Sequence, residues 1–210
     1  MILTKLAIFD IDKTIIKSDS MFRFIWYGIQ KKPWTFLNLF AICLNTGLYK
    51  LRLMQVEKVK ASYFYSIRFM EEADLEHFYT SVLVPAVYRD AMMEMEERKR
   101  QGFRVLLVSA SPHAYVKYFR KLPCVDDVIG TELARQNGRY TNVIEGNNCK
   151  GEEKVLRITR YLQSKGLKID FDHSCAYSDS LSDWPMFRLV KHRYLVNRHN
   201  ANLQELRWNS

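Results

Sequence analysis

Three short apolar segments, each ending in small polar or acidic residues, constrain the fold of this chain more than any other feature. They are KLAIF (5–9), RVLLVS (104–109) and HSCAYSD (173–179). A short, uninterrupted apolar run is typical of a strand buried on both faces of a parallel sheet. Helical patterns lie between these runs, at 88–101, 112–121 and 152–165. The alternation predicts a right-handed parallel α/β sheet, which binds ligands at the carboxyl ends of its strands.

Composition narrows the class of protein. The 210 residues suffice for one core with a modest insertion, and 48% hydrophobic with 26% charged residues excludes a disordered or fibrous chain. The net charge of +9 favours an anionic partner, such as a phosphorylated substrate, acidic lipid or nucleic acid. Four widely spaced cysteines predict reduced thiols, and Met1 opens no secretory leader, so we expect a cytoplasmic protein.

Residues 17–86 interrupt the alternation with consecutive aromatic-rich helical patterns and no obvious strand. We therefore expect a catalytic α/β core formed by 1–16 and 87–210, with 17–86 as a helical cap inserted after the first strand. Farther along, Asn137-Gly138 between extended residues predicts a two-residue β-hairpin. The tail after Arg193 is interpreted as one more strand followed by a short terminal helix.

Within this insertion, residues 33–49 contain no charge. A helix over them would be about 26 Å long, at the bottom of the membrane-spanning range, and polar residues dilute it. Two interpretations remain, a helix buried in the cap or an interfacial helix on the acidic inner face of the cell membrane. Residues 17–60 carry eight Lys or Arg against two acids, which suits the second, although solvated helix faces are the simpler explanation. Candidates for an embedded face are Phe36, Leu39, Phe40 and Leu44.

Side chains suited to phosphate chemistry follow the first two predicted strands. In FDIDKT, Asp10 and Asp12 are two residues apart directly after the first strand. Alone the pair fits a turn, but Asp10 can also act as a nucleophile while Asp12 moves protons, with a divalent cation holding the first carboxylate ionised. After the second strand, the Ser109 hydroxyl and backbone N–H groups, as at Ala110, can bind phosphate oxygens.

Two further motifs lie in the second half of the chain. CKGEEKV places Lys150 and Lys154 near the start of a predicted helix, where a cation is disfavoured unless it meets an anion. Without its neighbours, a solvated surface lysine is the simpler interpretation. YSDSLSDWP places Asp179 and Asp183 four residues apart at a strand-to-helix turn. Such acids are commonly helix caps, and they are also the hard oxygen ligands that Mg²⁺ requires.

The order of these motifs, DxDxT, a serine after a strand, a lysine and DxxxD, resembles the haloacid dehalogenase (HAD) superfamily of phosphohydrolases. The resemblance covers Lys5 to about Val196. It implies an HAD-like Rossmannoid core and, over it, the C1-type cap of the phosphoserine phosphatase-like branch, subfamily IB. The variants SASP, CxGxEKV, YSDSxxDxP and HRxxV are most similar to a narrower group of the phosphatidylglycerophosphatase C type.

The resemblance also implies a role for each motif. Asp10 is the nucleophile that forms an aspartyl-phosphate, and Asp12 is the general acid and base. Ser109 and Ala110 bind the phosphoryl group, and Lys154 stabilises its charge and that of Asp10. Mg²⁺ is implied as the cofactor; its expected ligands are Asp10, Asp179 and the backbone carbonyl of Asp12, with Asp183 supporting the metal shell.

The sequence departs from the family pattern at two points. Lys13 stands where the family usually has Gly, so the loop is less permissive and a cation enters the rim of the site. The lysine of the third motif is ambiguous, because Lys150 precedes a Gly as in some phosphoserine phosphatases. Lys154 fits better when positions are counted relative to the helix that follows, so we assign the third-motif lysine to Lys154.

We therefore expect a Mg²⁺-dependent phosphomonoesterase whose substrate is a small phosphomonoester, phosphoserine-like, or a lipid phosphate such as phosphatidylglycerophosphate. The alternative is a non-catalytic phosphate- or lipid-binding module on the same scaffold. That alternative predicts loss of the motif acids, and all of them are present. Nucleic acid is not expected as a partner, because no helix-turn-helix, RNA-recognition or zinc-finger signature accompanies the positive charge.

Overall fold

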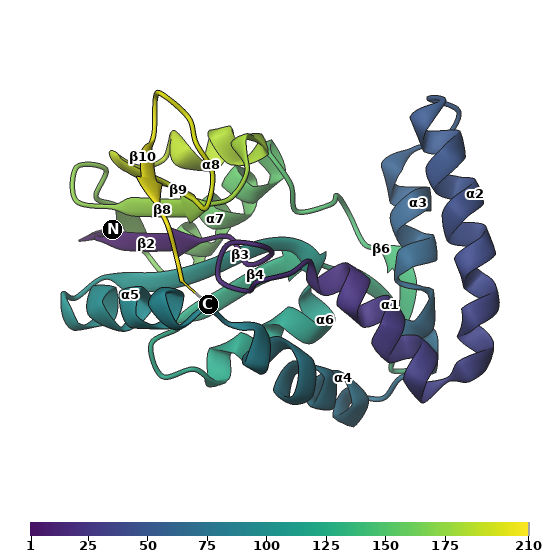
Figure 1. Ribbon diagram of the computed structural model, residues 1–210. Helices are drawn as coiled ribbons and strands as arrows, with labels where there is room; N and C mark the ends of the chain where they lie inside the picture. The colour runs from purple at the N-terminus through teal and green to yellow at the C-terminus, as the bar shows by residue number, and fades with distance from the viewer. Residues whose placement is uncertain (210) are drawn as a thin grey trace.

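A six-stranded parallel sheet forms the centre of the computed structural model, which describes residues 1–209 (Figure 1). The strand order is β10 (Gln204–Leu206), β9 (His192–Val196), β8 (Cys175–Ser178), β2 (Leu6–Phe9), β3 (Arg104–Pro112) and β4 (Asp127–Thr131). The three apolar runs are the adjacent strands β8, β2 and β3, and each pair is parallel. The predicted α/β fold with a parallel sheet is confirmed.

Helices cover both faces of this sheet. Successive side chains of a strand point to opposite faces, so β2 contributes residues to both hydrophobic clusters. Leu6 and Ile8 of β2 pack with α7 (Glu152–Ser164) and α8 (Trp184–Phe187). Ala7 and Phe9 join the second cluster, which contains residues of α5 (Arg89–Arg100) and α6 (His113–Val116). A 3₁₀ helix, η5 (Lys117–Lys121), continues α6. Apart from its first residue, each of the three runs is buried, as its uninterrupted hydrophobicity predicts.

Between β2 and α5 the chain forms only helical elements. They are α1 (Ser20–Lys31), η1 (Pro33–Leu37), α2 (Asn38–Lys50), α3 (Val56–Tyr63), η2 (Tyr65–Phe69), α4 (Glu72–Phe78), η3 (Tyr79–Leu83) and η4 (Val84–Ala86). In Figure 1, α2 and α3 form a hairpin that stands apart from the sheet. Ile16 and Val87 pair in an isolated β-bridge, so the chain leaves the core and returns to it at neighbouring points.

The predicted hairpin is present, as β5 (Leu133–Gln136) and β6 (Arg139–Ile144). Its turn residues Asn137 and Gly138 have φ of 52° and 78°, the left-handed conformation that a two-residue turn requires. The hairpin packs against the cap, since the Asn142 side chain donates to the carbonyl of Ala61 at 2.8 Å. A core segment therefore enlarges the cap. A separate two-stranded sheet joins β1 (Ile2–Thr4) to β7 (Leu167–Ile169).

One local prediction was wrong, and one of the two interpretations of residues 33–49 is excluded. The terminal segment forms the edge strand β10 instead of a helix, because residues 204–206 pair in parallel with 194–196 of β9. Residues 33–49 do not form one buried helix: η1 is followed by α2, and none of the 13 residues of α2 is buried. Within residues 1–209, no helix is both long and apolar enough to cross a membrane.

Candidate active site

A cavity of about 330 Å³ lies at the carboxyl ends of β2, β3 and β8, on the side of the core that faces the cap. Residues of all four motifs line it, among them Asp10, Asp12, Ala110, Lys154, Asp179 and Asp183. The first two come from the loop after β2 and the last two from the segment after β8, so residues up to 173 positions apart meet here. A volume of this size accommodates a phosphoryl group with a modest leaving group.

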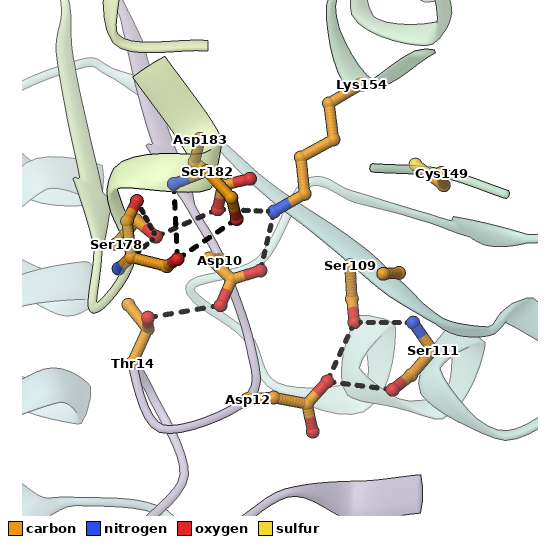
Figure 2. A network of polar contacts seen from close by, with 12 residues as sticks. Asp10, Asp12, Thr14, Ser109, Ser111, Cys149, Lys154, Ser178, Ser182 and Asp183 are labelled. Carbon is orange, nitrogen blue, oxygen red and sulfur yellow. Dashed lines mark hydrogen bonds and ion pairs between the residues drawn. The ribbon is translucent and has the colours of Figure 1, made fainter. Parts of the chain in front are cut away.

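Asp10 and Lys154 form a buried ion pair at the base of this cavity (Figure 2). The Lys154 ammonium donates to Asp10 Oδ1 at 2.6 Å and to Asp183 Oδ2 at 2.8 Å. Thr14 donates its hydroxyl to the other Asp10 oxygen at 3.1 Å, and Ser178 donates to Asp183 at 2.8 Å. Lys154 and Thr14 therefore hold one oxygen each of the Asp10 carboxylate at the end of its strand.

The register of α7 determines which lysine reaches the nucleophile candidate. Lys154 is the third residue of α7 and is only 1% exposed, whereas Lys150 precedes the helix and is exposed. Lys150 still lines the cavity, at its rim. Gly151 has φ of 59°, which turns the chain between the two lysines. The structure therefore places Lys154, and not Lys150, against Asp10.

Asp12 lies apart from this ion pair and is held by the other wall. Its Oδ2 accepts hydrogen bonds from Ser109 Oγ at 3.0 Å and Ser111 Oγ at 2.7 Å, and its Oδ1 accepts one from the backbone N–H of Ser20 at 2.6 Å (Figure 2). Ser20 begins the first cap helix, so the same bond ties the cap to the motif loop. Asp12 is thus oriented by the end of β3 and by the start of α1, and it shares no hydrogen bond with Lys154.

The structure places Ser109 differently from its neighbour Ala110. Ser109 is completely buried, does not line the cavity, and gives its hydroxyl hydrogen to Asp12. Ala110 and Ser111 line the cavity instead. In the arrangement shown, Ser109 positions Asp12, and its contact with a phosphoryl group stays a prediction.

The carboxylate set fits a hard cation such as Mg²⁺. Asp10 and Asp179 both line the cavity, and the Thr14 hydroxyl links them, since it donates to Asp10 and accepts from the Asp179 backbone N–H at 2.9 Å. Within residues 1–209, no three His, Cys, Asp or Glu side chains converge as a ready-made metal cluster. Mg²⁺ does not require one, because it usually binds one or two carboxylates and keeps several waters. Asp183 bonds to Lys154 and Ser178, so its contribution to a metal shell stays a prediction.

Electrostatics at the site follow from burying several carboxylates together. Burial raises the pKa of Asp10 to about 7; the Lys154 charge opposes this rise, and Asp183 and Asp12 add to it. Burial alone lowers the pKa of Lys154, but the two carboxylates that it contacts raise it above its ordinary value. Burial also raises the pKa of Asp179, against the effect of Arg198 at 3.4 Å.

Lys13 adopts the conformation that explains the family's preference for glycine. Its φ is 58°, in the left-handed region that L residues other than glycine seldom adopt. The side chain is exposed and lines the cavity. The expectation of a cation at the rim therefore agrees with the geometry. The left-handed backbone conformation of Lys13 is locally strained.

Lys60 is a cavity residue that motif reasoning did not identify. It comes from cap helix α3, and its ammonium donates to the carbonyl of Ala110 at 3.0 Å and to Asn148 Oδ1 at 2.7 Å. Burial lowers the pKa of Lys60 to about 8, although the charge of Asp12 opposes this. In the sequence it is one of eight basic residues in a lopsided segment, and nothing there marks it as inward-facing. Only cap packing brings it to the cavity.

Comparison with known proteins agrees with this arrangement. Residues 7–188 match the model of the haloacid dehalogenase-like hydrolases. The chain belongs to this family. A histidinol-phosphatase of Neisseria meningitidis is 26% identical over 206 residues, which cover 91% of this chain and 90% of that protein. The family and the type of enzyme, an HAD-type phosphatase, are thus as predicted.

Solved structures show the same fold. A Bordetella pertussis protein of unknown function has a TM-score of 0.83 at 21% identity, covering 97% of this chain and 98% of that one. A substrate-bound phosphoserine phosphatase has a TM-score of 0.65 at 16% identity, covering 92% and 86% of the two chains. At these identities the likeness concerns the fold, so the substrate has to be argued from the site.

Proposed function

We propose that this HAD-type phosphatase is a Mg²⁺-dependent phosphomonoesterase that acts through an aspartyl-phosphate on Asp10. The observation that carries the proposal is the Asp10–Lys154 ion pair at the base of the cavity, with Asp12 held separately on the opposite wall. A nucleophile needs its charge and aim maintained, and a proton-transferring group needs a different environment. The two aspartates satisfy these separate requirements although they are only two residues apart.

In the first half-reaction, an Asp10 carboxylate oxygen attacks phosphorus and the bond from phosphorus to the leaving oxygen breaks. Lys154 stabilises the negative charge on the phosphoryl oxygens, and Asp12 gives its proton to the leaving alkoxide. In the second, Asp12 takes a proton from a water molecule that attacks the aspartyl-phosphate. The bond between phosphorus and the Asp10 oxygen breaks, which releases inorganic phosphate, restores the Asp10 carboxylate and leaves Asp12 protonated as at the start.

Asp10, Asp179 and the backbone carbonyl of Asp12 are the groups that would hold Mg²⁺. A bound Mg²⁺ supplies positive charge that keeps Asp10 ionised and offsets the charge on the phosphoryl oxygens. This matters because burial raises the pKa of Asp10 to about 7 in the protein alone. Thr14 assists by holding the second oxygen of Asp10 and the backbone of Asp179.

The substrate is a phosphomonoester whose leaving group enters beside the cap. Met21, Asp19 and Lys60 are the cap residues that line the cavity. Small phosphates, with phosphoserine and histidinol phosphate as examples, and lipid phosphates are the two sources of that chemistry. A screen that includes both, with the lipid phosphates in detergent micelles, identifies the preferred leaving group.

The test of the proposal is Asp10→Asn in the full chain with Mg²⁺ present. Turnover and any acid-stable phosphoenzyme are expected to disappear while the thermal midpoint stays close to that of the wild type. Asp12→Asn is expected to slow both half-reactions, and the surface variant Asp172→Asn serves as the control because it lies outside the cavity. Near-wild-type hydrolysis by Asp10→Asn overturns the proposal. Retained phosphate binding with no turnover in the wild type would instead indicate the non-catalytic module.

A further inference from the structure

The cap carries an exposed apolar stripe along the outer side of α2 and η1. It consists of Phe36, Leu37, Phe40, Leu44 and Leu51. Phe36, Phe40 and Leu44 follow one another at intervals of four residues, Leu37 precedes Phe40 by three and Leu51 follows Leu44 by seven, which places them on one side of a helical path. Leu37 is 75% exposed and Phe40 is 78% exposed, so nothing in the described chain covers them. Leu39, a candidate from the sequence, is only half-buried and does not belong to this stripe.

Hydrogen bonds attach the other side of α2 to α3. Asn38 donates to the carbonyl of Ser62 at 2.6 Å, and the Thr46 and Tyr63 hydroxyls share a hydrogen bond of 2.8 Å. Both partners lie at the end of α3, next to the rest of the cap. In Figure 1, α3 lies between α2 and the sheet, so α2 is the outermost element of the cap. The stripe is therefore an unpartnered face and does not belong to the cap core.

The charges around the stripe indicate what covers it. Residues 20–56 contain five Lys or Arg and no Asp or Glu. Lys31 and Lys32 lie before the stripe. Lys50 and Arg52 lie on either side of Leu51, its last residue, so basic residues flank both ends. Two copies of this face would bring like charges together, which disfavours self-association through it. An anionic surface with an apolar interior complements the charge and the hydrophobicity at once.

We infer that the stripe docks the protein on the surface of an acidic lipid bilayer. At 13 residues, α2 is about 20 Å long, so it is too short to cross a hydrocarbon core and lies in the interface instead. The stripe enters the boundary between headgroups and acyl chains, and the flanking cations contact anionic headgroups. Each such cation strengthens binding about fivefold, by the roughly 1 kcal/mol it gains near an acidic surface.

The experiment is flotation of the full chain with vesicles of phosphatidylcholine alone or with about a third phosphatidylglycerol, at low and high salt. Binding is expected only to the acidic vesicles, with partial release at high salt. Phe36→Ser with Phe40→Ser is expected to weaken that binding at least tenfold. The thermal midpoint and hydrolysis of a small water-soluble phosphomonoester stay unchanged, because both side chains are exposed and outside the cavity.

A matched control replaces exposed apolar residues on the core, Met93→Ser with Leu156→Ser, and is expected to bind like the wild type. No binding of the wild type to acidic vesicles overturns the inference, as does equal loss of binding in the control variant. The inference is also overturned if the wild type dimerises and the variant with Phe36→Ser and Phe40→Ser does not, because the stripe would then bind a second copy. The catalytic variant Asp10→Asn is expected to float normally, so failure of docking and failure of the proposed reaction are separately visible.

Discussion

Replacing Lys154 by methionine tests the buried ion pair directly. The substitution keeps the length and hydrophobic stem of the side chain but removes the charge that contacts Asp10 and Asp183. All three residues are buried, so the two carboxylates lose the cation that contacts both of them in an environment with little water. Breaking a buried ion pair by removing one partner costs about 3–5 kcal/mol of unfolding free energy. For a chain of this size, that lowers the thermal midpoint by about 6–20 °C.

The pH dependence of that loss follows from Asp10. Its pKa in the folded protein is raised to about 7 from 3.8, so between these values the folded state binds more protons than the unfolded state. Stability from this group is therefore present at low pH and is lost as pH rises towards 7. Without Lys154 the pKa of Asp10 rises further. The difference between variant and wild type is thus largest near neutral pH and shrinks towards pH 4.

Urea unfolding at pH 5 and pH 8 measures both quantities, with EDTA present so that no metal replaces the lost charge. Lys150→Met is the matched control; because Lys150 is exposed, its unfolding free energy is expected to change by no more than about 0.5 kcal/mol. Turnover with Mg²⁺ is expected to vanish in the Lys154 variant and to persist in the Lys150 variant. A loss below about 1 kcal/mol, or an equal loss at both pH values, refutes the reasoning about the buried pair.

Three further outcomes are expected. Exhaustive chelation abolishes turnover, Mg²⁺ restores it and Ca²⁺ does not, because the larger Ca²⁺ takes more ligands in a looser geometry; full activity after chelation contradicts the metal assignment. The KM of the wild type rises above pH 8 as Lys60, with its pKa lowered to about 8, loses its charge, whereas Lys60→Arg keeps a flat KM; identical profiles would remove Lys60 from substrate binding. Gly130→Ala lowers the unfolding free energy by about 1–3 kcal/mol, since the new Cβ lies 2.7 Å from the His113 backbone, while Gly47→Ala, in open space within α2, raises it by up to about 1 kcal/mol; denaturant midpoints that change in the opposite sense would show that these contacts are misjudged.

The sequence by itself predicts the three central strands of the sheet, the helices between them and the end of the sheet at which the motif residues lie. This works because apolar runs and helical periodicity depend on local spacing, and a parallel sheet places the carboxyl ends of its strands at one edge. The hairpin turn at Asn137 and Gly138 is equally local, since it depends on two residues that tolerate positive φ. Residues from all four motifs meet in the cavity, although Ser109 itself does not line it.

Only the tertiary structure decided what depends on packing between distant segments. The choice of Lys154 over Lys150 rests on how α7 lies against β2, and Lys60 reaches the cavity only because α3 folds over the core. The strand β10 forms because β9 offers an unpaired edge, which local propensity does not reveal. Hydrophobicity marked residues 33–49, but burial depends on whether another element covers them. No element within residues 1–209 covers Phe36, Leu37, Phe40 and Leu44, so these apolar residues form the outer surface of the cap.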